Sequence, residues 1–329
     1  MKNIAVLTVL VIIVGVLTAN NPAYCQDKKE RNYCFLFGTQ YGFVHGQSLE
    51  LVYPVPGETK GELLSELKWD MKPVFYYGAQ IDFSRRDLMS GPGFFSSVSF
   101  KAGVPGDSGI MEDRDWMSQE NGNLTHFSSH TNKTRELFWL DASLGASFPV
   151  KSYFHVKTFL SGSWMRFSFT GRDGKLKYAR IKTNNPDTYY PIDYNPEVKS
   201  LTGDDINYAQ EWLLIAAGFS IGAKFLSRFS LDLSFKISPF TYCAAMDEHL
   251  ARKDTFMDFT GWGLFLEPAG SLSFTVEQIE FSLGFTYRYI GQTWGESYTK
   301  HSDGYFYQNG DAGAGLSLSD LRFLIRLQI

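Results

Sequence analysis

Two short clusters, far apart in the chain, contain the residues best suited to hydrolytic chemistry. Asp113 and Asp115 form the first, and Asp247 and His249 form the second. One residue separates the members of each pair, so on a β-strand both members share a face. Two carboxylates held close together cannot both ionise freely, so one pKa rises and the pair can hold a water molecule. A carboxylate beside an imidazole fixes its tautomer and makes it a general base.

Each cluster alone has a plain alternative, since a solvated loop could contain the same residues. The two clusters predict a catalytic cleft only if the fold brings them to facing sides of one opening. Whether they meet depends on the secondary structure that positions them.

Period-two alternation runs through most of the chain after residue 30. Apolar residues in the stretches 94–104, 229–237, 281–289 and 321–329 alternate with small, polar or charged ones. Such alternation predicts strands with one apolar face, in either a soluble sandwich or a membrane barrel. Apolar faces that end in Tyr or Trp, as an interfacial girdle does, favour the barrel. The expected strands are 33–54, 62–84, 93–113, 134–150, 152–171, 207–224, 228–247, 255–275, 277–294 and 313–329.

These ranges predict an all-β fold, a ten-stranded antiparallel transmembrane β-barrel of the outer membrane. An even count returns both chain ends to the periplasm and places the long polar loops outside. Lys101, Asp232, Lys236, Arg288 and Arg322 would then fill the narrow lumen.

Strand parity makes a specific prediction about each cluster. Continuing the alternation from Lys101 places Asp113 and Asp115 on the inward face. Asp247 and His249 fall on the lipid-facing parity of the stretch 229–237. A β-bulge near Pro239 would turn them inward, or the strand is already clear of the membrane there.

The first residues indicate export. Lys2 precedes an apolar run from Ala5 to Ala19, followed by a polar stretch with small residues that ends near Gln26. We interpret residues 1–25 as a signal peptide and residues 26–329 as the barrel domain. The alternatives are an uncleaved anchor helix, for which the run is short, and a lipoprotein lipidated at Cys25.

Bulk properties narrow the function classes. The net charge of −4 gives no basic surface for a nucleic-acid partner. Cys34 and Cys243 lie too far apart in the chain to indicate a disulfide framework, and they lack metal-ligand spacing.

Five stretches, in order along the chain, resemble the omptin family of outer-membrane proteases. Asp-x-Asp-Trp-Met ends at Met117, and Asp247-Glu248-His249 matches the Asp-Glu-His dyad motif. The other matches are Arg166 to Gly174, Leu64 to Trp69, and a partial match at Thr125, Ser128 and His130 that lacks the family's Trp and Pro. The chain ends in Ile329, where outer-membrane barrels usually have Phe.

The resemblance implies an endopeptidase whose catalytic residues are Asp113, Asp115, Asp247 and His249. A water molecule between the two pairs would attack the peptide bond of an extracellular polypeptide, with no metal, cofactor or covalent intermediate. Glu50 matches one carboxylate of the family's pocket for basic side chains, which pair with acids by charge.

The second pocket carboxylate of the family corresponds to Ala245, so the resemblance implies a weakened or altered preference for basic residues. Arg166 matches a contact to lipopolysaccharide, while Gly162 and Trp164 replace its polar neighbours. Outer-membrane lipid is therefore a second expected partner.

Two rival functions remain at this stage. A barrel of this kind could act as an adhesin or receptor without proteolysis, or it could be a pore. Retention of all four catalytic positions favours the protease, and a narrow ten-stranded lumen disfavours the pore.

Overall fold

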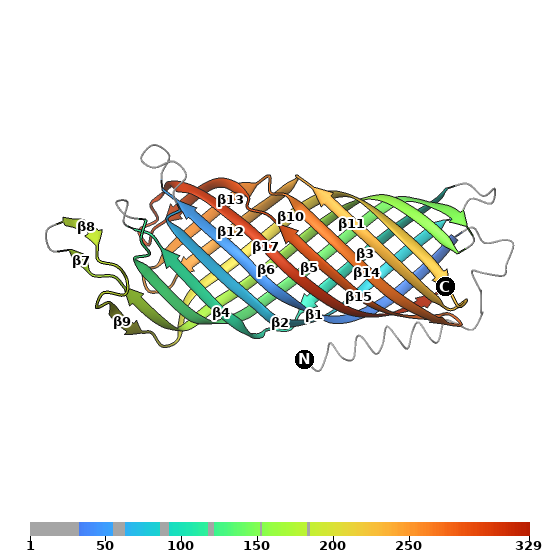
Figure 1. Ribbon diagram of the computed structural model, residues 1–329, viewed down its shortest axis with the longest axis horizontal. Helices are drawn as coiled ribbons and strands as arrows, with labels where there is room; N and C mark the ends of the chain where they lie inside the picture. The colour runs from blue at the N-terminus through green and yellow to red at the C-terminus, as the bar shows by residue number, and fades with distance from the viewer. Residues whose placement is uncertain (1–32, 55–62, 86–91, 118–121, 152, 183–184) are drawn as a thin grey trace.

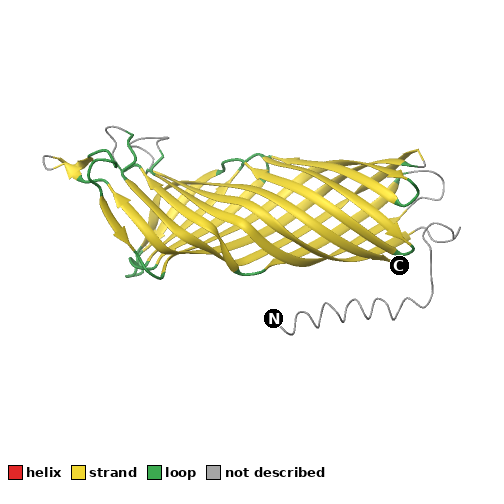
Figure 2. Ribbon diagram, turned by 60° about the horizontal axis from the view of Figure 1, so that its bottom comes forward, coloured by secondary structure: helices red, strands yellow, loops and turns green. Residues whose placement is uncertain are grey.

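The protein is a long, closed β-barrel in the computed structural model, which describes residues 33–54, 63–85, 92–117, 122–151, 153–182 and 185–329. Figure 1 shows the strands crossing the barrel obliquely, and Figure 2 shows that the described residues form strands and loops alone. No helix within these ranges is long and apolar enough to cross a membrane. The proposed signal peptide, residues 1–25, lies outside the described residues.

Seventeen strand elements make up the described structure. Their bounds are β1 Tyr33–Tyr53, β2 Ser65–Arg85, β3 Gly93–Gly103, β4 Gly106–Asp115, β5 His126–Lys151, β6 Phe154–Tyr178, β7 Ile181–Lys182, β8 Asn185–Tyr189, β9 Glu197–Ser200, β10 Asp204–Phe225, β11 Phe229–Ser238, β12 Thr241–His249, β13 Asp254–Gly261, β14 Phe265–Val276, β15 Ile279–Ile290, β16 Trp294–Lys300 and β17 Phe306–Gln328.

Ten of these strands close on themselves by antiparallel pairing. The ring runs β1–β2–β3–β5–β6–β10–β11–β14–β15–β17 and returns to β1. Four shorter elements, β4, β12, β13 and β16, continue β3, β11, β14 and β15 toward one end of the barrel. The ten-stranded barrel expected from the alternation is therefore present, with four of its strands interrupted.

The strands are longer than the alternation predicts. β5 spans 126–151 instead of 134–150, β6 reaches residue 178 instead of 171, and β17 begins at 306 instead of 313. Pairing continues past the point where the outward side chains stop being apolar, so the apolar pattern alone underestimates strand length. Much of what the sequence suggests as loop is thus barrel wall.

The outer face carries a broad apolar belt. Its exposed side chains include Phe75, Ile81, Val98, Leu144, Leu160, Leu213, Ile215, Phe219, Leu233, Leu283, Phe285 and Phe323. Toward the end that carries β4, β12 and β13, a polar cluster borders this belt, in which Arg166 Nε lies 3.1 Å from Glu136 and Nη1 lies 3.5 Å from Glu211. Such a belt on a closed barrel is what the hydrocarbon core of a bilayer requires.

Charged side chains fill the lumen inside the apolar belt. Lys236 Nζ lies 2.8 Å from Glu267. Arg288 also pairs with Glu267, and its Nη2 lies 3.1 Å from Asp141. Lys101 Nζ lies 2.5 Å from Asp320. Above these pairs, buried Trp69, Trp139, Trp212, Phe167 and Phe169 extend the packed core toward the opening. Side chains line the lumen as expected for a narrow barrel, but they leave a cavity of about 150 Å³ between Lys101, Lys236, Arg288 and Arg322.

Candidate active site

The second candidate cluster, Asp247 and His249, points inward because the strand changes parity just before it. In β11, Ser238 is buried, so even-numbered residues face the interior. In β12, the odd-numbered Thr241, Cys243, Ala245 and Asp247 are buried instead. The two residues between the strands, Pro239 and Phe240, stand outside the ladder, because proline has no N–H to donate. The irregularity predicted near Pro239 is confirmed.

The first cluster also faces inward, although its parity is not continuous with Lys101. The strand is interrupted between β3 and β4, and after the interruption the even-numbered Ser108 is the buried residue. A second irregularity follows at Gly109, whose φ of 107° favours glycine. Two changes of parity cancel, so Asp113 again lies on the same side as Lys101.

Asp113 and Asp115 form a partly buried acidic pair on β4. Asp113 accepts a hydrogen bond of 3.2 Å from Ser65 Oγ on the neighbouring strand β2. Burial, then the charge of Asp115, raises the pKa of Asp113 well above its usual range. Burial also raises the pKa of Asp115, and a hydrogen bond from Ser65, followed by the neighbouring His126 and His249, partly offsets this rise. The pair therefore retains a proton to higher pH than an isolated aspartate would.

His249 is held by hydrogen bonds at both ring nitrogens. Its Nε2 lies 2.8 Å from Asp247 Oδ2, and Arg252 Nη2 lies 2.7 Å from its Nδ1. Because guanidinium only donates, Nδ1 accepts this bond and the Nε2 proton points to Asp247. Phe256 packs edge-on against the ring at 5.4 Å. The dyad therefore has the arrangement of a base with its orienting acid, with Arg252 on the basic nitrogen.

The two clusters act on each other electrostatically across the barrel opening. β4 and β12 are not neighbours, since β5, β6 and β10 lie between them in the wall. Even so, the charge of Asp247 contributes to the raised pKa of Asp113, and His249 opposes part of the rise in the pKa of Asp115. The two clusters therefore lie within electrostatic reach of each other.

Aromatic and histidine side chains form the wall between the clusters. Trp69 is fully buried and stacks on Tyr208 at 5.1 Å and on Phe169 at 5.7 Å. His130 is buried beside them, with its Nε2 3.0 Å from Ser128 Oγ. Parts of the sequence that matched other family signatures thus lie around the same opening.

Glu50, the expected substrate-binding residue, lies on β1 with only 2% of its surface exposed. Its Oε2 has no hydrogen-bond partner within the described structure. Burial, then the charges of Asp247, Asp258 and Asp113, raises its pKa well above the usual range. Glu50 therefore shares an electrostatic environment with both candidate clusters.

The structure adds two residues that the sequence reading missed. Arg252 contacts His249, and Asp258 on β13 lies directly across the ladder from Ala245. A single aspartate in an alternating segment carries no motif, so only its inward parity could have marked Asp258. Across the described ranges, no three His, Cys, Asp or Glu side chains are grouped as metal ligands would be.

Comparison with known proteins identifies a matching family and a similar solved structure. The sequence matches the Omptin family over residues 32–328. Its fold is similar to that of the outer membrane protease OmpT from Escherichia coli, with a TM-score of 0.76 and 17% identity over 94% of this chain and 99% of that chain. No curated protein matches in a sequence comparison.

Other solved structures are less similar to this chain. The toluene transporter TodX of Pseudomonas putida has a TM-score of 0.35 at 8% identity, covering 94% of this chain and 92% of that chain. The attachment protein Ail of Yersinia pestis has a TM-score of 0.27 at 8% identity, covering 88% and 99%.

Proposed function

Since this chain belongs to the omptin family, we propose that it is an outer-membrane endopeptidase that hydrolyses peptide bonds of polypeptides outside the cell. The observation that carries the proposal is the Asp247–His249 hydrogen bond of 2.8 Å on the inner wall of the opening that Asp113 and Asp115 also line. One solved structure with a similar fold is that of an outer membrane protease from Escherichia coli.

The proposed mechanism uses a water molecule as the nucleophile. His249, oriented by Asp247, accepts a proton from this water at Nδ1, the ring nitrogen that carries the lone pair. This step requires Arg252, which donates to Nδ1 in the structure, to release that nitrogen. The Asp113/Asp115 pair holds the water on the opposite side, and its shared proton can hydrogen-bond the developing oxyanion. No side chain forms a covalent bond to the substrate.

The apolar belt supports the proposed location. The site residues lie on strand segments beyond the polar cluster of Arg166, Glu136 and Glu211 that borders the belt. With the belt in the outer membrane, the site stands above the bilayer and faces outside, where long loops of such barrels lie. Lipopolysaccharide or a similar lipid is the proposed partner of this border.

A peptide-cleavage assay with purified, refolded protein tests the function. We expect His249→Ala and Asp113→Ala to lower kcat/KM by at least about 10³-fold, as losses of a general base or its water-holding partner do. His301→Ala is the matched control, because His301 pairs with Asp254 at 2.8 Å as a second Asp–His pair near the rim. The control should keep its activity.

Two outcomes would contradict the proposal. Equal activity in wild type and both variants would remove the catalytic assignment. Peptide binding without cleavage by folded wild-type protein would favour a barrel that serves as an adhesin or receptor. Folding is checked by circular dichroism, since every variant must keep the barrel before its activity is compared.

A further inference from the structure

Glu50 and Asp258 are buried acids without a cation. They are 2% and 4% exposed, and no Lys, Arg or His of the described residues lies within ion-pair distance of either. Glu50 Oε2 and Asp258 Oδ1 also have no hydrogen-bond partner there. The buried acids deeper in the lumen differ, since Glu267 is matched by Lys236 at 2.8 Å.

The two acids converge on one space. Asp258 pairs across the ladder with Ala245 on β12 and with Ser297 on β16, while Glu50 pairs with Ala314 on β17. The side chains at both alanine positions are small, and the charge of Asp258 is among the causes that raise the pKa of Glu50. The charges of Asp258 and Glu50 both act on the buried thiol of Cys243, and after burial they raise its pKa.

This space adjoins the catalytic dyad. Ala245 and Asp247 are successive inward-facing residues of β12, so Asp258 lies one inward position along the wall from the dyad aspartate. The titratable groups that face Asp258 are Glu50 from β1, Asp247 and Cys243 from β12, and Tyr208 from β10. None of them is a cation, so none of them would repel an incoming positive charge.

We propose that Asp258 is a specificity-determining residue that, with Glu50, binds the Lys or Arg side chain of the substrate beside the scissile bond. The neighbouring strand β13 thereby supplies the carboxylate that is missing at position 245. A long basic side chain would donate to the unpartnered Glu50 Oε2 and Asp258 Oδ1. Such charge-assisted bonds are about twice as strong as neutral ones. The assignment rests on the proposed function, whose site it extends.

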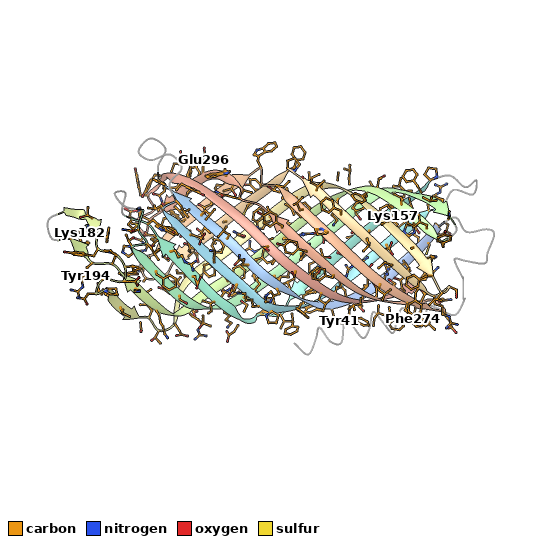
Figure 3. All side chains as sticks on the ribbon, in the orientation of Figure 1. Tyr41, Lys157, Lys182, Tyr194, Phe274 and Glu296 are labelled. Atoms are coloured by element: carbon orange, nitrogen blue, oxygen red, sulfur yellow. The ribbon has the colours of Figure 1, made fainter. Side chains whose placement is uncertain are left out.

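Matched peptides test the pocket. One pair places Lys or its neutral counterpart norleucine beside the cut, and a second pair places Arg or citrulline there. We expect Asp258→Asn to lower kcat/KM for the Lys and Arg peptides by about 10- to 100-fold, the size of a lost hydrogen bond to a charged group, and the neutral peptides by less than about twofold. The control is Glu296→Gln, since Glu296 is exposed on the outer face of β16 (Figure 3).

A selective loss on the cationic peptides, absent in the control, supports the pocket. An equal loss on cationic and neutral peptides would assign Asp258 a structural role and overturn it. Unchanged kinetics would overturn it as well.

A peptide-binding measurement tests this pocket independently of the proposed protease activity. In His249→Ala protein, calorimetry compares the Kd of the Lys peptide with that of the norleucine peptide, with and without Asp258→Asn. Selectivity for Lys that disappears with Asp258→Asn supports the pocket even if wild-type protein cleaves neither peptide, an outcome in which the protease proposal alone fails. Equal affinity for both peptides in His249→Ala protein would end the pocket assignment.

Discussion

The substitution Asp258→Asn should stabilise the protein, and the gain should grow with pH. Burial raises the pKa of Asp258 from 3.8 to about 7, with a hydrogen bond from Ser297 opposing the shift and the charge of Asp247 adding to it. The folded protein therefore retains a proton that the unfolded chain releases. Asp258 costs the protein no stability below the unfolded pKa of 3.8. Its cost to the free energy of unfolding grows as pH rises from there toward about 7.

The magnitude follows from the size of this shift. At about 1.4 kcal/mol per pKa unit, the shift from 3.8 to about 7 corresponds to a loss of about 4 kcal/mol, an upper limit because water can relax around the site. Asparagine has nearly the same shape and cannot ionise. The variant should therefore exceed wild type in free energy of unfolding by a larger margin at about pH 8.5 than at about pH 5.

Urea unfolding of the refolded barrel, followed by tryptophan fluorescence, measures this margin at both pH values. Glu296→Gln serves as the exposed control and should show no such growth, since surface charges contribute little. A margin that is constant or shrinks with pH would refute the picture of Asp258 as a buried acid without a cation.

Two further predictions concern the dyad. Arg252→Ala should raise kcat/KM about two- to fivefold at low salt, because an exposed contact on His249 Nδ1 is weak, and a loss as large as that of His249→Ala would instead make Arg252 essential for positioning the ring. Deletion of Phe240 should abolish cleavage while circular dichroism still reports a barrel, because it shifts Asp247 to the outer face; retained activity would contradict the role of this parity change.

The alternating apolar residues determined the fold class. Period two follows directly from strand geometry, so the sequence alone predicts ten antiparallel strands and the inward position of Lys101. Strand ends were less predictable: β5 begins at His126 instead of residue 134, because pairing depends on the neighbouring strand and not on lipid-facing side chains. Spacing likewise identified Asp113, Asp115, Asp247 and His249 as partners, since residues two apart share a face.

Only the tertiary structure decided which acids share the opening. Asp258 carries no sequence motif, and its meaning arises from the register that sets it opposite Ala245 on another strand. The lateral order β12–β13–β16 and the cancelling irregularities before Asp113 are likewise properties of closed pairing. Local sequence sets the face on which a side chain lies, but closure of the barrel sets which distant faces meet, because the ladder bonds join strands that are far apart in the chain.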